Sequence, residues 1–417
     1  MSLRSAIGTM ILGKVIAQVI SVFGVFILAQ LYNPADFGYF SSFLAVATII
    51  GSVSSWRYDL SILMSRSVAG SHFAAVLAIG ISIVTITALA AVATILALMG
   101  ILNGKYVIAL VLMTSGIAIL NISAFTQSRK KRYQRQVAIE LARPIGLILL
   151  GILFFYFPIS DSGLVDASAI SLLILGFLVL AVEYRRYPWK AFLSKRRSIR
   201  IWLAHYRDLP RYAAPAVLLN TLSMASPPIL IMWLFGPTLA GLFALTMRIV
   251  GMPASTISRA VNVVYQREVA ERKNESFRIL PMTLKIFSIM TITSVGIFLI
   301  LVYIIRKDYL QIIFSTEWQE LGRYVLIASP MLVARFVAGS VAGFGVLGYS
   351  SVGLLIQGLN FFMVISSLFF AYLIGASGDR VIGALSWSLA FASFVQIVVT
   401  FWITRNVDLK RFPGRFL

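Results

Sequence analysis

The chain has 417 residues, of which 59% are hydrophobic and 12% charged, and its formal net charge is +21 at pH 7. An ordinary soluble domain carries about 25% charged residues, and no polar stretch here is long enough to bury a core of its own. The composition therefore excludes a separate soluble domain and predicts an all-α, polytopic membrane protein. Cysteine is absent, which excludes disulfides and thiolate metal sites, and we expect no cofactor. His72 and His205 are expected to be interfacial residues at helix edges.

About twelve apolar runs are long enough to cross the hydrocarbon core of a bilayer, which takes about 20 residues. They fall at 5–31, 37–64, 73–100, 105–128, 136–158, 163–184, 210–235, 238–265, 280–305, 323–347, 351–375 and 381–404. The first run is too long for the apolar region of a signal peptide, so we expect it to stay as a membrane helix. Three glycines, Gly343, Gly345 and Gly348, weaken the helical pattern between the tenth and eleventh runs.

The distribution of Lys and Arg predicts the orientation of these helices, because cytoplasmic loops carry an excess of basic residues. With the N-terminus inside, the inner loops and tails hold 23 basic residues and the outer loops hold five. The inner set includes the cluster at 129–132 and the long basic loop at 185–207. We therefore predict that both termini are cytoplasmic, and that the charge faces membrane lipid and not nucleic acid.

An internal repeat divides the chain. Residues 31–40 (LYNPADFGYF) match residues 234–243 (LFGPTLAGLF) at an offset of 203, and each copy joins the first and second helices of a six-helix half. We predict an N-terminal half at 1–200, which ends in the basic linker, and a C-terminal half at 201–417. Parallel repeats of this kind place substrate sites in a central cavity at the interface between halves. The alternative is two unrelated bundles with a chance loop match.

Charged residues inside the predicted spans are the candidate functional residues, because such charge is expensive in a bilayer. Eight are basic and four are acidic: Asp59, Glu140 and, within one turn of the ends of the sixth run, Asp166 and Glu183. Glu140 has the spacing of a local pair with Arg143, and cations near helix ends reach the interface. Five cations lie about two or more turns from the nearest helix end and are the predicted site residues: Lys14, Arg57, Arg248, Arg259 and Arg335.

The spacing of the site residues suggests one basic surface. Arg248 and Arg259 are eleven residues apart, which on a regular helix puts them on one face. Pro253 between them lacks a backbone donor and is a predicted hinge. Asp59 is a predicted charge partner or coupling group, although on a helix residues 57 and 59 point to different faces.

An arginine-lined cavity favours an anion, and guanidinium binds phosphate through paired hydrogen bonds. Such a site could hold a pyrophosphate whose acyl chain stays in the lipid. The alternative is that these arginines bond backbone carbonyls or reach the interface.

Two stretches carry a resemblance to a known family. The run LYNPADFGYFSSFLAVATIIGSVSSWRYDLSILMSRS resembles the start of Wzx-type polysaccharide flippases. The run GPTLAGLFALTMRIVGMPASTISRAVNVVYQREVAE resembles their eighth-helix region. These belong to the multidrug/oligosaccharidyl-lipid/polysaccharide (MOP) exporter superfamily, which also contains the MATE multidrug exporters. The resemblance covers essentially the whole chain.

The resemblance implies a bacterial inner-membrane protein that moves an undecaprenyl-diphosphate-linked oligosaccharide from the cytoplasmic to the outer leaflet by alternating access. It implies no enzymatic activity, and a polysaccharide polymerase or export complex as a partner. Related peptidoglycan-precursor flippases contact the diphosphate with cations on the first, second and eighth helices, which correspond to Lys14, Arg57 and Arg248. The first of these is Lys where the relatives have Arg. A multidrug or other small-molecule antiporter of the same fold is the alternative, although the scarcity of acids in the spans argues against it. A membrane enzyme and a non-transporting scaffold are further alternatives.

Overall fold

The protein is described by a computed structural model over residues 3–99, 104–158, 163–184, 196–274, 277–307, 314 and 316–411. These residues are almost entirely helical, and no strand occurs among them. Twelve helical segments in the described ranges are long and apolar enough to cross a membrane. This confirms the predicted all-α, multi-pass membrane protein. The chain divides into two compact units, Met1–Ile229 and Leu230–Leu417.

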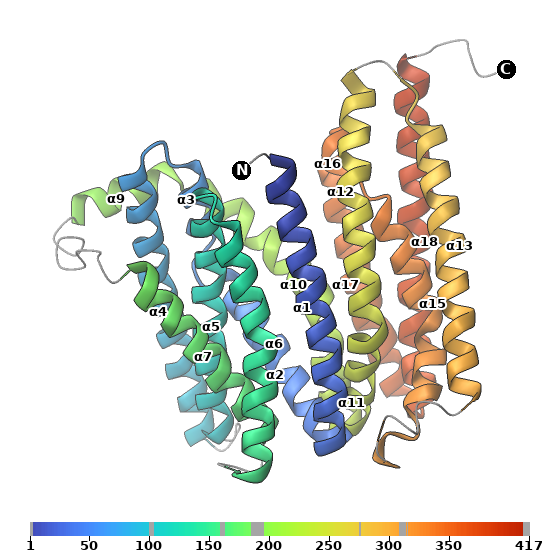
Figure 1. Ribbon diagram of the computed structural model, residues 1–417, viewed down its shortest axis with the longest axis horizontal. Helices are drawn as coiled ribbons and strands as arrows, with labels where there is room; N and C mark the ends of the chain where they lie inside the picture. Colours follow the sequence, from blue (N-terminus) through green and yellow to red (C-terminus); the bar gives the residue numbers. More distant parts are fainter. Residues whose placement is uncertain are drawn as a thin grey trace. The chain divides into compact units, whose positions relative to one another are not determined.

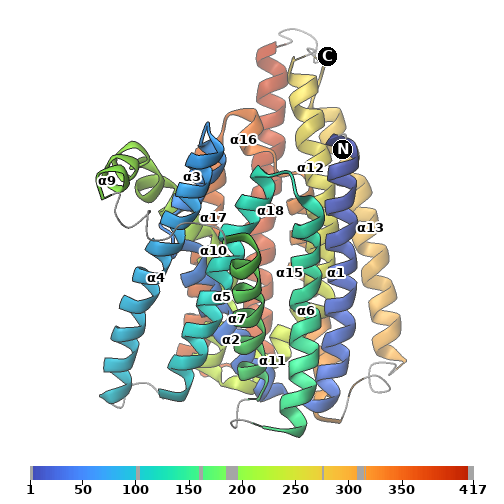
Figure 2. The ribbon, with the colours of Figure 1, turned by 60° about the vertical axis from the view of Figure 1, so that its left-hand side comes forward.

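The first unit is a bundle built around α5 (Figures 1 and 2). Its elements are α1 (Leu3–Leu31), α2 (Pro34–Val53), a short 3₁₀ turn (Tyr58–Leu60) with α3 (Ser61–Met64), α4 (Val68–Leu98), α5 (Gly104–Arg129), α6 (Tyr133–Tyr156) and α7 (Gly163–Tyr184). α9 (Arg196–His205) and a π turn (Leu209–Ala213) follow, and α10 (Ala214–Phe235) leads into the second unit. α5 packs against α2, α4 and α7.

The second unit is built in the same way around α15. Its elements are α11 (Pro237–Thr246), a π turn (Met247–Gly251), α12 (Met252–Asn274), α13 (Leu280–Arg306), a 3₁₀ turn (Thr316–Trp318), α15 (Leu321–Ser340), α16 (Phe344–Leu347), α17 (Ser350–Leu373) and α18 (Gly378–Arg411). α15 packs against α12, α13 and α18, and α17 packs against α18. These pairings correspond to those of α5 with α2, α4 and α7 and of α6 with α7, as an internal repeat requires.

The two copies of the repeated turn start their helices by different means. At the first copy, the Asn33 side chain accepts the Asp36 N–H at 2.9 Å and the Asp36 carboxylate accepts the Asn33 N–H at 3.2 Å, which is a reciprocal capping box. At the second copy, Gly236 takes a positive φ of 95° and makes no side-chain cap. Pro34 and Pro237 each occupy the first helical turn, where no backbone donor is needed.

The predicted continuous helix at 37–64 is wrong in its last part. α2 ends at Val53, and the backbone of Trp56 and Arg57 turns left-handed, with φ of 49° and 63°. The serines before the turn contribute to the break, because the Ser54 hydroxyl donates to the Gly51 carbonyl and so competes with the helical ladder. Arg57 and Asp59 therefore lie on a connector between α2 and α4 and not on a helix.

Two other predicted spans are interrupted where the sequence has Gly or Pro. The eighth contains the π turn Met247–Gly251 just before Pro253. The tenth ends at Ser340, and the short α16 follows before Gly348 turns left-handed with φ of 89°. The weak helical pattern predicted around 345–352 is confirmed.

Candidate functional site

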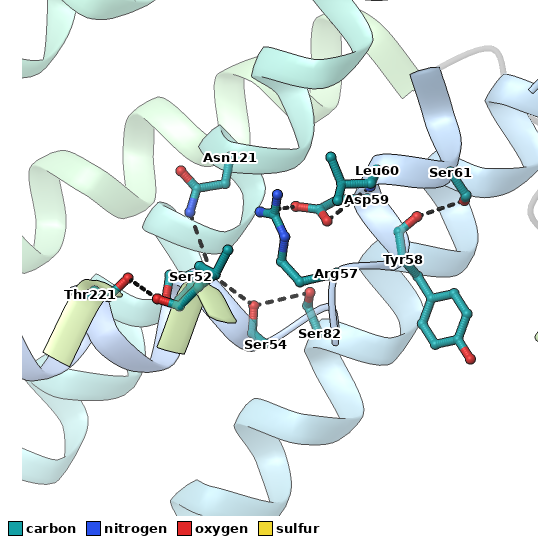
Figure 3. A network of polar contacts seen from close by, with 12 residues as sticks. Ser52, Ser54, Arg57, Tyr58, Asp59, Leu60, Ser61, Ser82, Asn121 and Thr221 are labelled. Carbon is teal, nitrogen blue, oxygen red and sulfur yellow. Dashed lines mark hydrogen bonds and ion pairs between the residues drawn. The ribbon is translucent and has the colours of Figure 1, made fainter. Parts of the chain in front are cut away.

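The connector between α2 and α4 joins Arg57 to Asp59 (Figure 3). The Arg57 Nη1 lies 3.5 Å from the Asp59 Oδ2, and the side chains are 15% and 3% exposed. The Arg57 Cζ also lies 5.4 Å from the ring centroid of Phe125 on α5, in a cation–π contact. The expectation that residues 57 and 59 point apart is therefore wrong, because it assumed a helix and the left-handed turn brings the two side chains together.

Burial and charge act in opposite directions on Asp59, which lies outside the helical spans. Burial raises the pKa of its carboxyl group, whereas Arg57 and the Leu60 N–H, which donates to Oδ1 at 3.0 Å, lower it. Arg57 thus favours the charged carboxylate. Within the described part of the chain, the buried Nε of Arg57 has no hydrogen-bond partner, so the guanidinium keeps one donor uncommitted.

A polar network that was not predicted from the sequence holds this connector in place. Ser54 bonds to Ser82 on α4 at 3.2 Å, and Asn121 on α5 donates to the Gly51 carbonyl at 3.5 Å (Figure 3). The indole of Trp56 donates to Thr85 at 3.2 Å. The density of serine in GSVSSW could have indicated a break in the helix, but it could not have identified these partners.

The linker helix α9 also contacts the connector. The Trp202 indole donates to the Ser61 hydroxyl at 3.2 Å, and the Tyr58 hydroxyl donates to the Leu203 carbonyl at 3.3 Å. Trp202 also packs beside Phe73, with ring centroids 5.3 Å apart. The position of Arg57 therefore depends on three helices besides its own connector: α4, α5 and α9.

The predicted stripe on the eighth span is altered by the π turn. In such a turn each backbone bond closes over five residues instead of four, so the helix beyond it is rotated relative to the helix before it. Arg248 lies in this turn and is buried, at 8% exposure, whereas Arg259 is exposed. Arg259 donates to the Ser255 carbonyl of its own helix at 3.1 Å, as in the backbone-bonding alternative considered from the sequence.

The remaining predicted site residues lie on separate helices. Lys14 is exposed on α1, and Arg335 is half-buried on α15. Among the described residues, Arg335 has no hydrogen-bond or ion-pair partner. The Ser258 hydroxyl donates to the Phe336 carbonyl at 2.8 Å, which joins α12 and α15 one residue away from Arg259 and Arg335. Arg57 and Asp59 are predicted site residues that contact each other directly.

Among the described residues, neither histidine belongs to a group of side chains that could hold a metal ion. His72 lies in the second turn of α4 and His205 is the last residue of α9. In the described ranges, no group of three or more His, Asp or Glu side chains could hold a metal ion. The predicted site residues in the described ranges are instead mainly cations, some of them buried or partly buried, and such groups suit phosphate.

Comparison with known proteins identifies the family. Residues 27–322, more than two thirds of the chain, match the family described as "Polysaccharide biosynthesis protein". No curated protein matches the sequence closely enough to count as a relative.

Solved structures of membrane transporters share the fold. A lipid II flippase MurJ in an inward closed conformation matches with a TM-score of 0.69 at 11% identity, over 96% of this chain and 90% of its own. An inward-facing MATE multidrug resistance transporter of the MOP superfamily matches with a TM-score of 0.67 at 15% identity, over 95% and 96%. A mutant of the Vibrio cholerae MATE transporter VcmN matches with a TM-score of 0.55 at 16% identity, over 98% and 99%. The chain therefore belongs to the polysaccharide biosynthesis protein family, and its fold is that of the MOP superfamily.

Proposed function

We propose that this protein is a flippase that moves an undecaprenyl-diphosphate-linked oligosaccharide from the cytoplasmic to the outer leaflet of a bacterial inner membrane by alternating access. Both termini are cytoplasmic in this proposal, and a polysaccharide polymerase or export complex takes the product. The protein itself carries out no bond chemistry.

One observation carries the proposal: a member of a polysaccharide biosynthesis family keeps a buried arginine, Arg248, inside a membrane-spanning segment. A charge at such a position is costly and marks a substrate or ion pathway. An arginine suits the diphosphate of a lipid-linked sugar, because its planar fork of donors matches phosphate oxygens. Lys14, Arg57, Arg259 and Arg335 are the other cations that we assign to substrate binding.

The contacts of Arg57 suggest how it exchanges partners. A diphosphate competes with the Asp59 carboxylate for the guanidinium, and the uncommitted Nε donor gives the phosphate an additional bond. When Arg57 turns to the phosphate, Asp59 loses the charge that lowers its pKa, so it takes up a proton more readily. Asp59 is therefore our candidate coupling group, and an Asp59→Asn variant that exports glycan at the wild-type rate under all ion gradients would remove that role.

The π turn and Pro253 provide a hinge in this proposal. Pro253 cannot donate a backbone bond, and the π turn beside it already departs from the regular ladder, so bending there breaks few hydrogen bonds. A hinge at this point moves Arg248 relative to the part of α12 that follows Pro253.

The test is the fate of the lipid-linked intermediate in cells. Loss of the protein should make undecaprenyl-diphosphate-linked oligosaccharide accumulate in the cytoplasmic leaflet, and the intact gene should restore its export. Extrusion of cationic drugs with no effect on that lipid would contradict the proposal and favour the small-molecule antiporter.

A further inference from the structure

A second polar surface lies in the first unit, on the neighbouring helices α1 and α6. The two helices run parallel and lie side by side (Figures 1 and 2). Their register follows from close approaches: a side chain at Gly13 would collide with Val137, and one at Gly24 with Ile148. Near the far end, the Tyr32 hydroxyl donates to the Gly151 carbonyl at 2.8 Å. Residues 14–18 of α1 therefore lie level with the second and third turns of α6.

Five polar side chains gather at this level. Lys14 and Gln18 are four residues apart on α1, and Gln136, Glu140 and Arg143 follow at spacings of four and three on α6. These spacings put each set on one face of its helix. Glu140 and Arg143 form a pair at 4.0 Å, and each side chain is 34% exposed. We call these five residues the α1–α6 polar surface.

The α1–α6 polar surface faces away from lipid. The exposed apolar side chains of α1 follow another stripe, which includes Ile16, Val19 and Phe23, and those of α6 include Leu149 and Leu153. At about 100° per residue, the polar stripe lies about 150° from the apolar stripe on α1 and about 130° from it on α6. On α1 the polar stripe shares its face with the buried residues Val25 and Leu28, so Gln18 lies between this buried part of the face and the exposed Lys14.

Three atoms of the α1–α6 polar surface are buried and have no hydrogen-bond partner within the described ranges: Gln18 Nε2, Gln136 Oε1 and Arg143 Nε. Buried polar groups are nearly always paired, so each such atom calls for a partner. Two of the three are donors and one is an acceptor.

The presence of both donors and an acceptor among the unpaired atoms distinguishes between classes of ligand. A diphosphate offers only acceptors, and Glu140 would repel it. A metal cation would leave the two donors unpaired and would be repelled by Lys14 and Arg143. A hydroxyl group both donates and accepts. We therefore propose that Gln18, Gln136 and Arg143 of the α1–α6 polar surface bind sugar hydroxyl groups of the lipid-linked substrate, beside Lys14, which we assign with the other cations to its diphosphate. This inference rests on the proposed flippase function.

The experiment compares two probes on the purified full chain in lipid nanodiscs. One probe is undecaprenyl diphosphate, and the other is the undecaprenyl-diphosphate-linked oligosaccharide extracted from cells that lack the protein. Binding is followed by native mass spectrometry for the wild type, Gln18→Leu and Gln136→Leu. Gln134→Leu is the matched control, because Gln134 is exposed on α6 and lies outside the polar surface.

We expect Gln18→Leu and Gln136→Leu each to weaken binding of the glycan-bearing lipid about fivefold to tenfold, as for one lost hydrogen bond. Binding of undecaprenyl diphosphate should stay unchanged, which also shows that the variants are folded. Gln134→Leu should change neither affinity. An unchanged affinity for the glycan-bearing lipid, or an equal loss for both probes, would overturn the inference.

The same data separate this inference from the proposed function. If the wild type binds neither probe, the flippase proposal itself fails. If undecaprenyl diphosphate binds and Arg248→Ala abolishes that binding, while the glycan makes no difference to affinity, the diphosphate site stands and the sugar site is wrong. If the change in affinity caused by Gln136→Leu depends on the sodium concentration and not on the presence of the glycan, the surface is a cation site. The inference is then also wrong.

Discussion

Replacing Arg57 by glycine separates the charge of Arg57 from its backbone conformation. The left-handed backbone at Arg57 costs about 1 kcal/mol for a residue with a side chain, and glycine removes that cost. The same change leaves the Asp59 carboxylate buried without its cation, and breaking a fully buried pair costs about 3–5 kcal/mol. Because the Arg57 side chain is 15% exposed, we reduce that figure to about 2–3 kcal/mol. Arg57→Gly should therefore destabilise the protein by about 1–2 kcal/mol.

The double variant Arg57→Gly with Asp59→Asn completes a double-mutant cycle that measures the interaction energy between the Arg57 and Asp59 side chains. An amide at 59 needs no cation, so in that background Arg57→Gly should cost nothing or increase stability by about 1 kcal/mol. The difference between the two backgrounds is a coupling energy of about 2–3 kcal/mol. The measurement is thermal or denaturant unfolding of all four proteins in the same detergent. An equal cost of Arg57→Gly in both backgrounds would refute the pairing.

The pH dependence of the Arg57→Gly variant has a defined sign. Burial raises the pKa of Asp59, and without Arg57 less opposes that rise. A carboxyl group whose folded-state pKa is raised stabilises the fold at low pH, and this contribution is lost as the pH rises through the folded-state pKa. Arg57→Gly should therefore approach wild-type stability on acidification, whereas the double variant should not show this recovery.

Three further predictions concern the second unit. Arg248→Ala should abolish glycan export while membrane insertion and protein level stay normal. The control Lys285→Ala, at an exposed position of α13, should leave export intact. Full complementation by Arg248→Ala would exclude Arg248 from the site. Pro253→Ala should restore a backbone donor beside the π turn and slow export severalfold without weakening undecaprenyl diphosphate binding, and unchanged transport kinetics would argue against a hinge. Asp408→Ala should lower the free energy of unfolding by about 2–4 kcal/mol, because its buried carboxylate accepts the N–H groups of Ile279 and Leu280 at 2.8–3.0 Å; an unchanged unfolding midpoint would contradict this.

The number and order of the membrane helices could be predicted because hydrophobic thickness imposes a length on each apolar run. The repeated Pro motifs also located two helix starts. The connector at Arg57 could not be predicted in this way, since apolar residues continue to Met64 and the left-handed turn falls on Trp56 and Arg57 instead of a glycine. Its conformation depends on tertiary contacts such as that of Ser54 with Ser82, which no local pattern contains.

The candidate site was predictable in its residue types more than in its geometry. Counting charges inside apolar runs makes Arg57 and Arg248 candidates, because the cost of such charges does not depend on the details of the fold. The relation between Arg248 and Arg259 was not predictable, since it assumed a regular helix and the π turn adds a residue to one turn. The α1–α6 polar surface could not be predicted from the sequence, because amides such as Gln18 and Gln136 carry no charge. These two side chains come together only because α1 and α6, which are distant in the sequence, pack against each other.

The unequal turns at Asn33 and Gly236 predict how the two halves of the repeat tolerate substitution. In a saturation mutagenesis library, position 33 should accept Asp, Ser or Thr, because each offers a side-chain acceptor to the start of α2. Position 236 should accept almost nothing but glycine, because its φ of 95° strains every residue with a Cβ. The two turns thus occupy matching places but start their helices by different chemistry, so a substitution tolerated at one of them is not expected to be tolerated at the other.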